Sequence, residues 1–411
     1  MELAIIGGGP AGLSAAIRAK EEGVSDVLLI ERGASLGGIL NQCIHHGFGL
    51  HIFKEELTGP EYAERLVRRA EQLGVRALTE TMVTDITRDR EITYVSSSGI
   101  KREQAKAVIL AMGCRERPRG ALGIPGGRCA GIYTAGTAQA FVNLKGLMPG
   151  KRVVILGSGD IGLIMARRLT LEGAAVLGVY ELMPYSGGLK RNIAQCLNDY
   201  NIPLFLSHTV ASVQGRERVE GVYTARVDEN RRPIPGTENF IPCDTLLLSV
   251  GLIPENELSK KIGVALSAVT GGALVNDRLE TNIPGVFSCG NVLHVHDLAD
   301  NVTLEAYEAA GNAARFIKGE RRGAGETIAV KPGRGARYTV PSSLIFAADE
   351  KAQDYEIHFR SDNIYKQAVI KVYADGAEIF SKRRRIVTPG EMEHARFTLT
   401  EAVSRIEVCV E

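Results

Sequence analysis

One short pattern occurs twice in this chain, and it limits the possible folds more than any other feature. A glycine-rich turn stands between an apolar strand-like segment and a helix-like segment near the N-terminus, as GGGPAG, and again in mid-chain, as GSGDIG. Glu31 follows Gly12, and Glu181 follows Gly162, by the same 19 residues. Strand, glycine turn, helix, strand and terminal acid, in that order, predict a parallel sheet that binds a dinucleotide. The chain is therefore expected to contain two such units.

The residues of the first turn each have a physical role. Gly7 permits the tight turn, Gly9 lets the backbone approach a pyrophosphate, and Gly12 lets the helix pack on the strand. The free N–H groups at the positive end of the helix then bind the phosphates. Glu31, at the end of the second strand, can accept hydrogen bonds from both hydroxyls of an adenosine ribose.

The second turn has the same parts and favours one nicotinamide cofactor. Its glycines are Gly157, Gly159 and Gly162, and Glu181 ends the next predicted strand. A carboxylate at this place bonds a free 2′-hydroxyl and repels a 2′-phosphate. No arginine directly follows the acid, so we expect NADH to be preferred over NADPH.

Composition excludes several other classes of protein. A chain of 411 residues is too long for one core, so two or three domains are expected. The net charge of +1 gives no indication of nucleic acid or an anionic membrane as a partner. No transmembrane segment and no secretory signal are predicted, which indicates a cytoplasmic protein. The seven cysteines are scattered and include no CxxC pair, which argues against a disulfide framework and against an iron–sulfur or zinc site within the chain.

Three further segments, together with the two turns, carry a resemblance to a known family. KAVILAMGCRERPR (106–119) and CDTLLLSVGLIPENEL (243–258) resemble the two crossings between domains in the pyridine nucleotide–disulfide oxidoreductase superfamily. LETNIPGVFSCGNV (279–292) resembles its motif near the flavin's ribityl chain. The resemblance implies an α/β fold with two Rossmann-like dinucleotide-binding domains, one inserted in the other, and an FAD-dependent NAD(P)H oxidoreductase activity.

The resemblance also implies domain boundaries and cofactor residues. Residues 1–117 and 244–325 would form the FAD-binding domain and residues 118–243 the NAD-binding domain. FAD would lie at the first turn and NAD(H) at the second, because the CGN segment returns to the N-terminal domain. The predicted cofactor-binding residues are Gly7, Gly9, Pro10, Ala11, Gly12, Glu31, Arg32, Gly38, Gly113, Gly157, Gly159, Ile161, Gly162, Glu181, Gly251, Gly290 and Asn291.

The chain departs from the disulfide reductases of this superfamily at the redox cysteines. No cysteine pair occurs where those enzymes hold one, so electrons must leave the flavin by another route. Cys43 lies 12 residues past Glu31, close to where single-cysteine NADH peroxidases and coenzyme A disulfide reductases hold a reactive thiolate. Two interpretations remain open: a redox-active thiolate, or a small inert residue packed near the cofactor.

Histidines cluster in two segments that should both approach the flavin. His294, His296 and Asp297 directly follow Asn291, which stands where the superfamily usually has Asp. His45, His46 and His51 lie near Cys43. Proton handling beside the flavin and purely structural hydrogen bonds are both possible roles. A metal site is not predicted, because histidines at strand spacing need a third and a fourth ligand. The candidate catalytic residues are Cys43, His45 and His296.

A narrower resemblance suggests that the chain works in a complex. GGILNQCIHHGFGLHIFKEELTGPEYAERL with CGNVLHVHDLADNVT resembles the FAD/NAD-dependent component that accompanies glycerol-3-phosphate dehydrogenase-like flavoproteins in bacteria. More weakly, the chain resembles flavin subunits of opine, proline and sarcosine oxidoreductases and of hydrogen cyanide synthase. The implied partners are a substrate-oxidising flavoprotein and a small cysteine-rich iron–sulfur or metal protein. The alternatives are a stand-alone NADH oxidase, peroxidase or disulfide reductase that uses Cys43, and a regulatory flavoprotein without turnover.

The C-terminal part differs in pattern from the rest of the chain. Segments such as YEIHFR and RIEVCVE alternate apolar and polar residues, and ADG supplies a hairpin turn. Residues 333–411 are therefore expected to form a small β-rich domain that docks a partner or covers a surface. SKRRRIV (381–387) is either a basic docking strand or a solvated strand edge.

Overall fold

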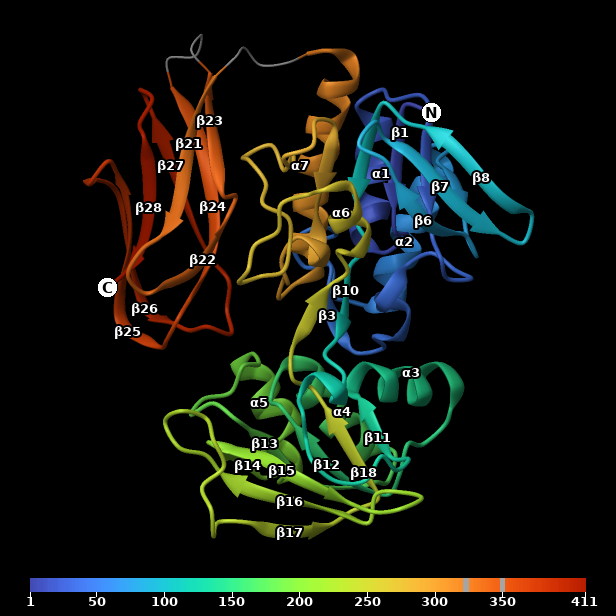
Figure 1. Cartoon of the computed structure of the whole chain (residues 1–411), viewed down its shortest axis with the longest axis vertical. Coiled ribbons are helices and arrows are strands. Elements are labelled where there is room, and N and C mark those ends of the chain that lie inside the picture. Colours follow the sequence, from blue (N-terminus) through green and yellow to red (C-terminus); the bar gives the residue numbers. More distant parts are fainter. Residues whose placement is uncertain (321–324, 348–351) are drawn as a thin grey trace. The chain divides into compact units, whose positions relative to one another are not determined.

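A computed structural model describes residues 1–320, 325–347 and 352–411 of the chain (Figure 1). The chain forms two compact units. Met1–Cys114 and Pro254–Glu411 make up the first, and Arg115–Ile253 the second. Within the described ranges, no helix combines the length and the apolar character needed to cross a membrane.

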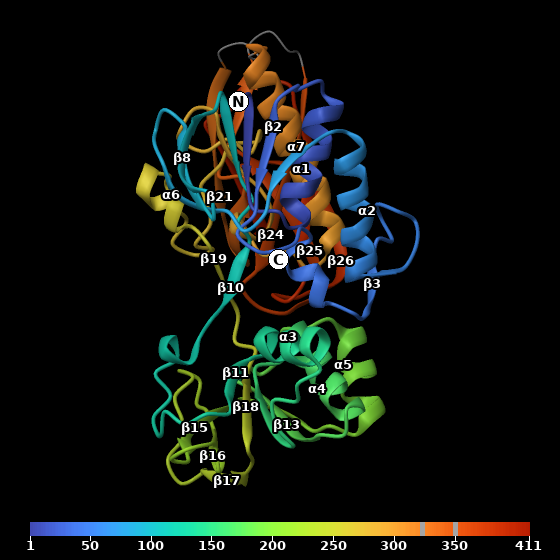
Figure 2. The same cartoon turned by 90° about the vertical axis from the view of Figure 1, so that its right-hand side faces the viewer.

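The first unit is built around a parallel sheet with the strand order β20-β9-β1-β2-β5. Its inner strands are short apolar runs with every residue buried, which is typical of strands covered on both faces. Two helices of this unit, α1 and α7, lie side by side (Figure 2). The bounds are β1 Leu3–Ile6, α1 Pro10–Glu21, β2 Val27–Ile30, α2 Gly59–Gln72, β5 Arg76–Leu78, β9 Ala107–Leu110, β20 Val286–Ser288 and α7 Ala299–Lys318.

Smaller elements complete this part of the first unit. The strands β6, β7 and β8 come between β5 and β9 in the chain and form an antiparallel sheet. β3 pairs with β4 near α2. Two short 3-10 helices occupy the segments that the sequence places beside the cofactor. The bounds are η1 Gly38–Gln42, β3 His46–Phe48, β4 Leu57–Thr58, β6 Met82–Ile86, β7 Glu91–Ser96, β8 Gly99–Gln104, α6 Glu257–Ile262 and η4 Gly290–Val292.

The second unit repeats the plan of the first. Its parallel sheet has the order β11-β18-β12-β13-β14, so each strand has a counterpart in the first sheet. An antiparallel sheet, β15-β16-β17, is appended to it. The bounds are η2 Arg119–Ala121, β11 Ile132–Thr134, α3 Ala135–Lys145, β12 Arg152–Leu156, α4 Asp160–Leu171, β13 Ala175–Glu181, α5 Lys190–Cys196, η3 Asn198–Tyr200, β14 Leu204–Leu206, β15 His208–Gln214, β16 Gly221–Arg226, β17 Asn239–Pro242 and β18 Thr245–Leu248. Two Rossmann-like sheets confirm the predicted fold class.

Two short strands connect the units. The boundaries that they mark differ from those expected from the sequence. β10 (Cys114–Glu116) leads out of the first unit, and β19 (Leu252–Pro254) leads back and pairs with it. The sequence pattern placed the return at residue 244, whereas the structure has it at Pro254. The difference arises because β18 is an inner strand of the second sheet, between β11 and β12.

The C-terminal residues form two antiparallel-rich sheets around one apolar core, as the alternating pattern predicted. The sheet orders are β23-β21-β28-β25-β26 and β22-β24-β27, with Ile357, Phe359 and Ile370 fully buried between them. This domain belongs to the first compact unit and does not stand apart as a third. The bounds are β21 Gly325–Pro332, β22 Ala336–Val340, β23 Ser343–Ala347, β24 Gln353–Ser361, β25 Tyr365–Ala374, β26 Ala377–Val387, β27 Glu393–Leu399 and β28 Arg405–Val410.

Candidate functional site

The first glycine turn ends in a helix terminus that can hold a phosphate. Gly9 is the N-cap of α1, Pro10 begins the helix, and neither a side-chain cap nor an acidic residue occupies the first turn. Gly7 has φ +107°, and a Cβ there would clash with the carbonyl of Ala111. A Cβ on Gly12 would clash with the carbonyl oxygen of Gly7. This cradle of unblocked N–H groups fits the pyrophosphate of a dinucleotide.

Glu31 lies where the adenosine ribose of that dinucleotide would be held. It directly follows β2, and its carboxylate accepts hydrogen bonds from the N–H of Gly8 at 2.7 Å and of Gly33 at 2.6 Å. Gly38 packs against the glycine turn: a Cβ on Gly38 would lie 2.9 Å from Cα of Gly9. The predicted residue Arg32 is exposed. Gly38 is thus placed beside the turn, whereas the Arg32 side chain extends into solvent.

The second turn has the same glycine geometry, although the first turn of α4 carries an acid, Asp160, that α1 lacks. Gly159 is the N-cap of α4 without a side-chain cap, and Gly157, with φ +96°, leaves no room for a Cβ beside the carbonyl of Ser249. The N–H of Gly162 donates to Oγ of Ser249 at 3.0 Å. Ile161, the fourth predicted residue of the turn, is half-buried against the apolar core of this unit.

Glu181 repeats the hydrogen bonds of Glu31. Its carboxylate accepts from the N–H of Ser158 at 2.9 Å and of Met183 at 2.9 Å, which lie 23 residues before it and two residues after it. Gly8 and Gly33 stand at the same two offsets from the carboxylate of the first unit. Oγ of Ser158 adds a third bond at 2.7 Å. The two sites are therefore alike in their bonding as well as in sequence.

The segment after β20 returns to the first turn, as the motif order predicted. Gly290 packs so closely on Ala11 that a Cβ on Gly290 would lie 2.7 Å from the alanine Cβ. Oδ1 of Asn291 accepts from the N–H of His296 at 3.1 Å, and its Nδ2 donates to Sγ of Cys114 at 3.7 Å. The amide of Asn291 thus ties the HVHD loop (residues 294–297) to the first residue of the crossing strand β10.

The two predicted crossing glycines lie at the paired connecting strands. The carbonyl of Gly113 accepts from the N–H of Glu255 at 3.0 Å within the first unit. The carbonyl of Gly251 accepts from the N–H of Arg117 at 3.0 Å within the second. Both glycines therefore hold β10 and β19 in register where the chain passes between the units.

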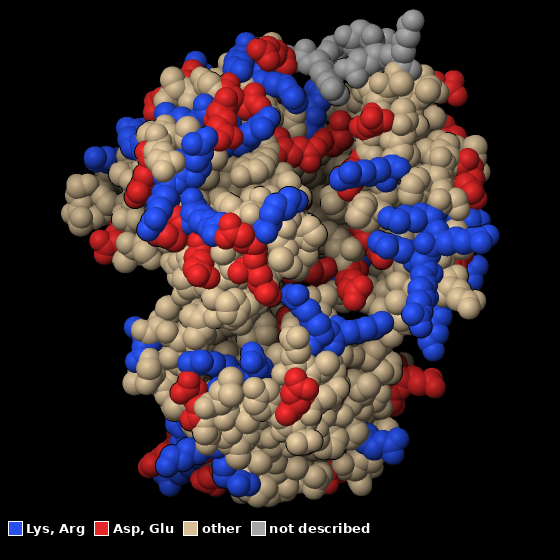
Figure 3. Space-filling model, turned by 180° about the vertical axis from the view of Figure 1, so that it is seen from behind, with Lys and Arg blue, Asp and Glu red and all other residues tan. Residues whose placement is uncertain are grey.

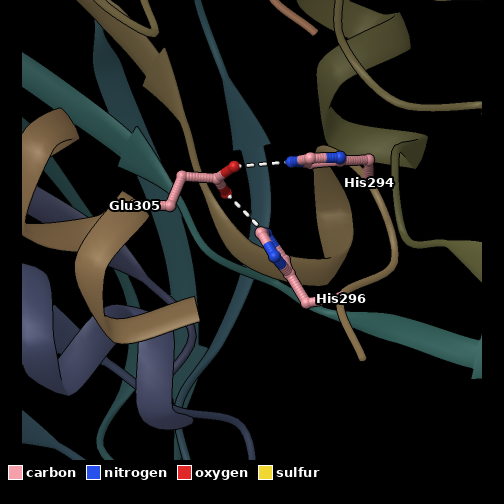
Figure 4. A group of neighbouring side chains, drawn as sticks. All are labelled: His294, His296 and Glu305. Atoms are coloured by element: carbon pink, nitrogen blue, oxygen red, sulfur yellow. Dashed lines mark hydrogen bonds and ion pairs between the residues drawn. The ribbon is translucent and has the colours of Figure 1, made fainter. Parts of the chain in front are cut away.

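Buried charge gathers at the HVHD loop and α7 (Figure 4). Nε2 of His294 lies 2.6 Å from Oε2 of Glu305, and Nε2 of His296 lies 3.1 Å from Oε1. Burial lowers the pKa of His294. Burial opposes ionisation of Glu305, but the two imidazoles outweigh it and hold the pKa of the carboxyl below its usual range. We call these three residues the His-His-Glu cluster.

The sequence patterns indicated the two histidines of this cluster and missed its acid. Glu305 lies on the small-residue face of α7, where Ala306, Ala309 and Ala310 are also buried. An acid next to a run of alanines on this helix was the available signal. The predicted trio is not gathered into one group: His296 contacts Glu305, while Cys43 and His45 lie in the segment after η1.

Cys43 is in an environment that keeps its sulfur protonated. Its Sγ donates to the carbonyl of Ile39 at 3.3 Å, and burial raises the pKa of the Cys43 thiol to about 12. Nδ1 of His45 lies 3.1 Å from the carbonyl oxygen of His46. This setting disfavours the thiolate interpretation of Cys43 at neutral pH.

Asp300 joins the two histidine-bearing segments. This buried residue lies in the first turn of α7, close after the HVHD loop, and its carboxylate accepts from the N–H of Gly49 at 3.1 Å and of Ile52 at 3.0 Å. The segment that contains Cys43 and His45 is therefore anchored to the start of α7.

The C-terminal β domain covers the HVHD loop. Arg360 on β24 forms an ion pair with Asp297 and donates to the carbonyl of Val295 at 3.0 Å. The N–H of Met392 donates to the other oxygen of Asp297 at 2.7 Å. Between α7 and this domain lies a cavity of 1130 Å³, lined by His296, Glu305, Tyr355, His358, Arg384 and His394 among others.

Two matched dinucleotide sites on two Rossmann-like sheets define an FAD-dependent NAD(P)H oxidoreductase. The sequence supports the same assignment: the model of the family "Pyridine nucleotide-disulphide oxidoreductase" matches residues 1–314, and the chain belongs to that family.

Individual relatives are more distant. The chain is 26% identical over 334 residues to hydrogen cyanide synthase subunit HcnB of Pseudomonas protegens, covering 76% of this chain and 68% of that protein. It is 28% identical over 283 residues to an opine oxidase subunit of Agrobacterium tumefaciens, covering 64% of this chain and 55% of the other. Among solved structures, thioredoxin reductase of T. acidophilum matches 76% of this chain and 97% of its own, with a TM-score of 0.62 and 24% identity. That last likeness is one of fold.

Proposed function

We propose that this chain is an electron-transfer subunit, which takes electrons from NADH into FAD and passes them to a partner dehydrogenase subunit. The observation that carries the proposal is the matched pair of acid-and-turn sites, with Glu31 in one unit and Glu181 in the other. Two complete sites fit two dinucleotides, one held and one exchanged.

The residues of the chain have separate tasks in this proposal. Bound FAD supplies the chemistry, because its flavin ring accepts a hydride from NADH. The N-terminus of α1 and Glu31 hold FAD, and the N-terminus of α4 and Glu181 hold NADH. Glu181 also disfavours NADPH, since its carboxylate would face a 2′-phosphate.

A partner is needed because no dithiol is available to take the electrons. No two of the seven cysteines stand in the CxxC or CxxxxC spacing of a redox pair. Two relatives are named as subunits, HcnB of a hydrogen cyanide synthase and the other of an opine oxidase. We propose the same arrangement here, with a glycerol-3-phosphate dehydrogenase-like flavoprotein and a small cysteine-rich iron–sulfur or metal protein as partners.

The edge strand β26 is the docking element in this proposal. It is the last strand of its sheet and carries exposed Arg383 and Arg385, with Lys366 exposed on the neighbouring strand. Lys and Arg side chains gather over the C-terminal β domain in Figure 3. An acidic surface on the partner would match this charge.

The proposal is tested by reducing the FAD-loaded chain with NADH and with NADPH, without oxygen. Loss of the flavin absorption near 450 nm should be much faster with NADH, and a dye should then be reduced in turnover. Rapid oxygen or peroxide consumption by the chain alone would contradict the role in a complex, since a stand-alone oxidase needs no partner.

A further inference from the structure

The His-His-Glu cluster has the composition and geometry of a metal site. The ligand atoms of His294, His296 and Glu305 all lie within 4.8 Å of one another. The two histidines come from the HVHD loop and the glutamate from α7, and all three side chains converge on one point (Figure 4). We propose that the cluster binds one first-row divalent metal ion of the zinc or iron(II) type. This proposal is independent of the electron-transfer function proposed above.

Hydrogen bonding within the cluster leaves buried nitrogen atoms unaccounted for. Within residues 1–320, 325–347 and 352–411, Nδ1 of His294 and both ring nitrogens of His296 are buried and lack a hydrogen-bond partner. Nε2 of His296 points at the carboxylate from 3.1 Å, yet it does not have the geometry of a hydrogen bond. A metal ion between the imidazoles and the carboxylate would satisfy this nitrogen.

Charge supports the same conclusion. The side chain of Glu305 is only 7% exposed, and those of His294 and His296 are 0% and 2% exposed. A carboxylate buried this deeply is costly in a low-dielectric interior unless a positive charge lies beside it. A divalent cation supplies that charge and prefers neutral imidazole ligands.

The ligand atoms of the cluster need to move little to coordinate a metal ion. Tetrahedral ligands at metal distances of about 2.0–2.1 Å are roughly 3.3 Å apart. The two histidine–carboxylate separations, 2.6 Å and 3.1 Å, would open by less than about 1 Å around an ion, and no separation between the three ligand atoms exceeds 4.8 Å. The N–H of Gly290 donates to Oε1 of Glu305 at 2.5 Å and orients the carboxylate from behind, as outer partners of metal ligands do.

The donor set indicates which metal and which coordination. Two imidazoles and one carboxylate suit zinc and non-haem iron(II), whereas magnesium and calcium prefer oxygen ligands alone. Three protein ligands leave at least one position open. His296 and Glu305 line the cavity between α7 and the C-terminal β domain, so the open position can be reached by water or a small anionic or hydroxylated ligand from that cavity.

The test is metal binding by the full-length FAD-loaded protein, produced without a histidine tag. Treated with chelator and titrated with Co²⁺ in the absence of oxygen, the protein should bind about one equivalent. Absorption bands between roughly 500 and 650 nm should appear, at wavelengths longer than the main flavin band. Native protein should contain near-stoichiometric zinc or iron by elemental analysis.

Three variants make the result specific. Glu305→Gln keeps the shape of the side chain and removes its charge, and His296→Ala removes one ligand; each should weaken Co²⁺ binding at least tenfold. His394→Ala lies in the same cavity outside the cluster and should bind Co²⁺ like the wild type. FAD content and the unfolding temperature show whether each variant is folded. The proposal is overturned if folded wild type binds no Co²⁺ tightly, or if folded Glu305→Gln binds it equally well.

Discussion

At the scale of single residues, we expect the binding of NADH to depend on Glu181. Replacing it with alanine removes a carboxylate that would bond the ribose of NADH, and such a charge-assisted bond is worth about 1.5–3 kcal/mol. We expect the KM for NADH to rise roughly 10- to 100-fold in Glu181→Ala, while FAD stays bound. Steady-state dye reduction measures KM, and absorbance at 450 nm measures bound FAD. A variant that released FAD and kept its KM would reverse the assignment of the two sites.

Glu31 provides the matched change in the other unit, since its carboxylate makes the corresponding pair of bonds. In Glu31→Ala we expect FAD to be lost more readily on dialysis, again by roughly 10- to 100-fold in affinity. After the variant is reloaded with excess FAD, its KM for NADH should be close to that of the wild type. A raised KM with normal FAD retention would contradict the assignment.

Cys43 gives a prediction that depends on pH. A thiol with a pKa of about 12 is almost entirely protonated two or more pH units below that value, so the thiolate is scarce between pH 6 and 9. The protein reduced by NADH should therefore show no long-wavelength thiolate–flavin absorption in this range. Cys43→Ser should be reduced by NADH at nearly the wild-type rate in stopped-flow measurements. A long-wavelength band that grows towards pH 9 and is absent from the variant would favour the redox-active thiolate instead.

At the scale of elements, Asp300 connects the start of α7 to the segment after η1. Asp300→Ala leaves the buried N–H of Gly49 and the part-buried N–H of Ile52 without their acceptor, which costs about 1.5–3 kcal/mol. We expect this loss in the free energy of unfolding by denaturant, together with faster proteolysis near residues 43–53. Glu64→Ala breaks an exposed pair with Arg68 on α2 and should cost under about 0.5 kcal/mol. Equal losses in the two variants would show that the anchor is unimportant.

Sequence patterns predicted those elements whose structure is determined by residues close together in the chain. Each glycine turn is specified within about 30 residues, so strand, turn, helix and acid could be placed directly. β18 was assigned to the wrong side of a boundary because its apolar run looks the same in either sheet. Glu305 was missed because its partners lie 9 and 11 residues away and meet it only when α7 folds back. The bond from Ser342 N–H to the Val275 carbonyl, which helps fix the β domain, has no side-chain signal at all.

At the scale of the whole molecule, the docking role proposed for β26 can be tested without deleting the domain that covers the HVHD loop. Arg383→Glu with Arg385→Glu should leave FAD content and NADH-dependent dye reduction unchanged, because neither side chain lies at a dinucleotide site. Copurification with the partner subunits should fall at least tenfold, and its salt dependence should weaken. Lys101→Glu with Arg102→Glu reverses two exposed charges on β8 and serves as the control. If the control pair impaired assembly equally, a specific role for β26 would be excluded.

Electrons from NADH are expected to enter the flavin and to stop there until a partner removes them. A titration of the oxidised, FAD-loaded chain with NADH in the absence of oxygen, followed at 450 nm, measures this directly. We expect about one equivalent of NADH per FAD to bleach the flavin completely, since one hydride carries the two electrons that the flavin accepts. An end point near two equivalents would contradict this expectation, because a second two-electron centre, such as an oxidised Cys43, would then share the electrons.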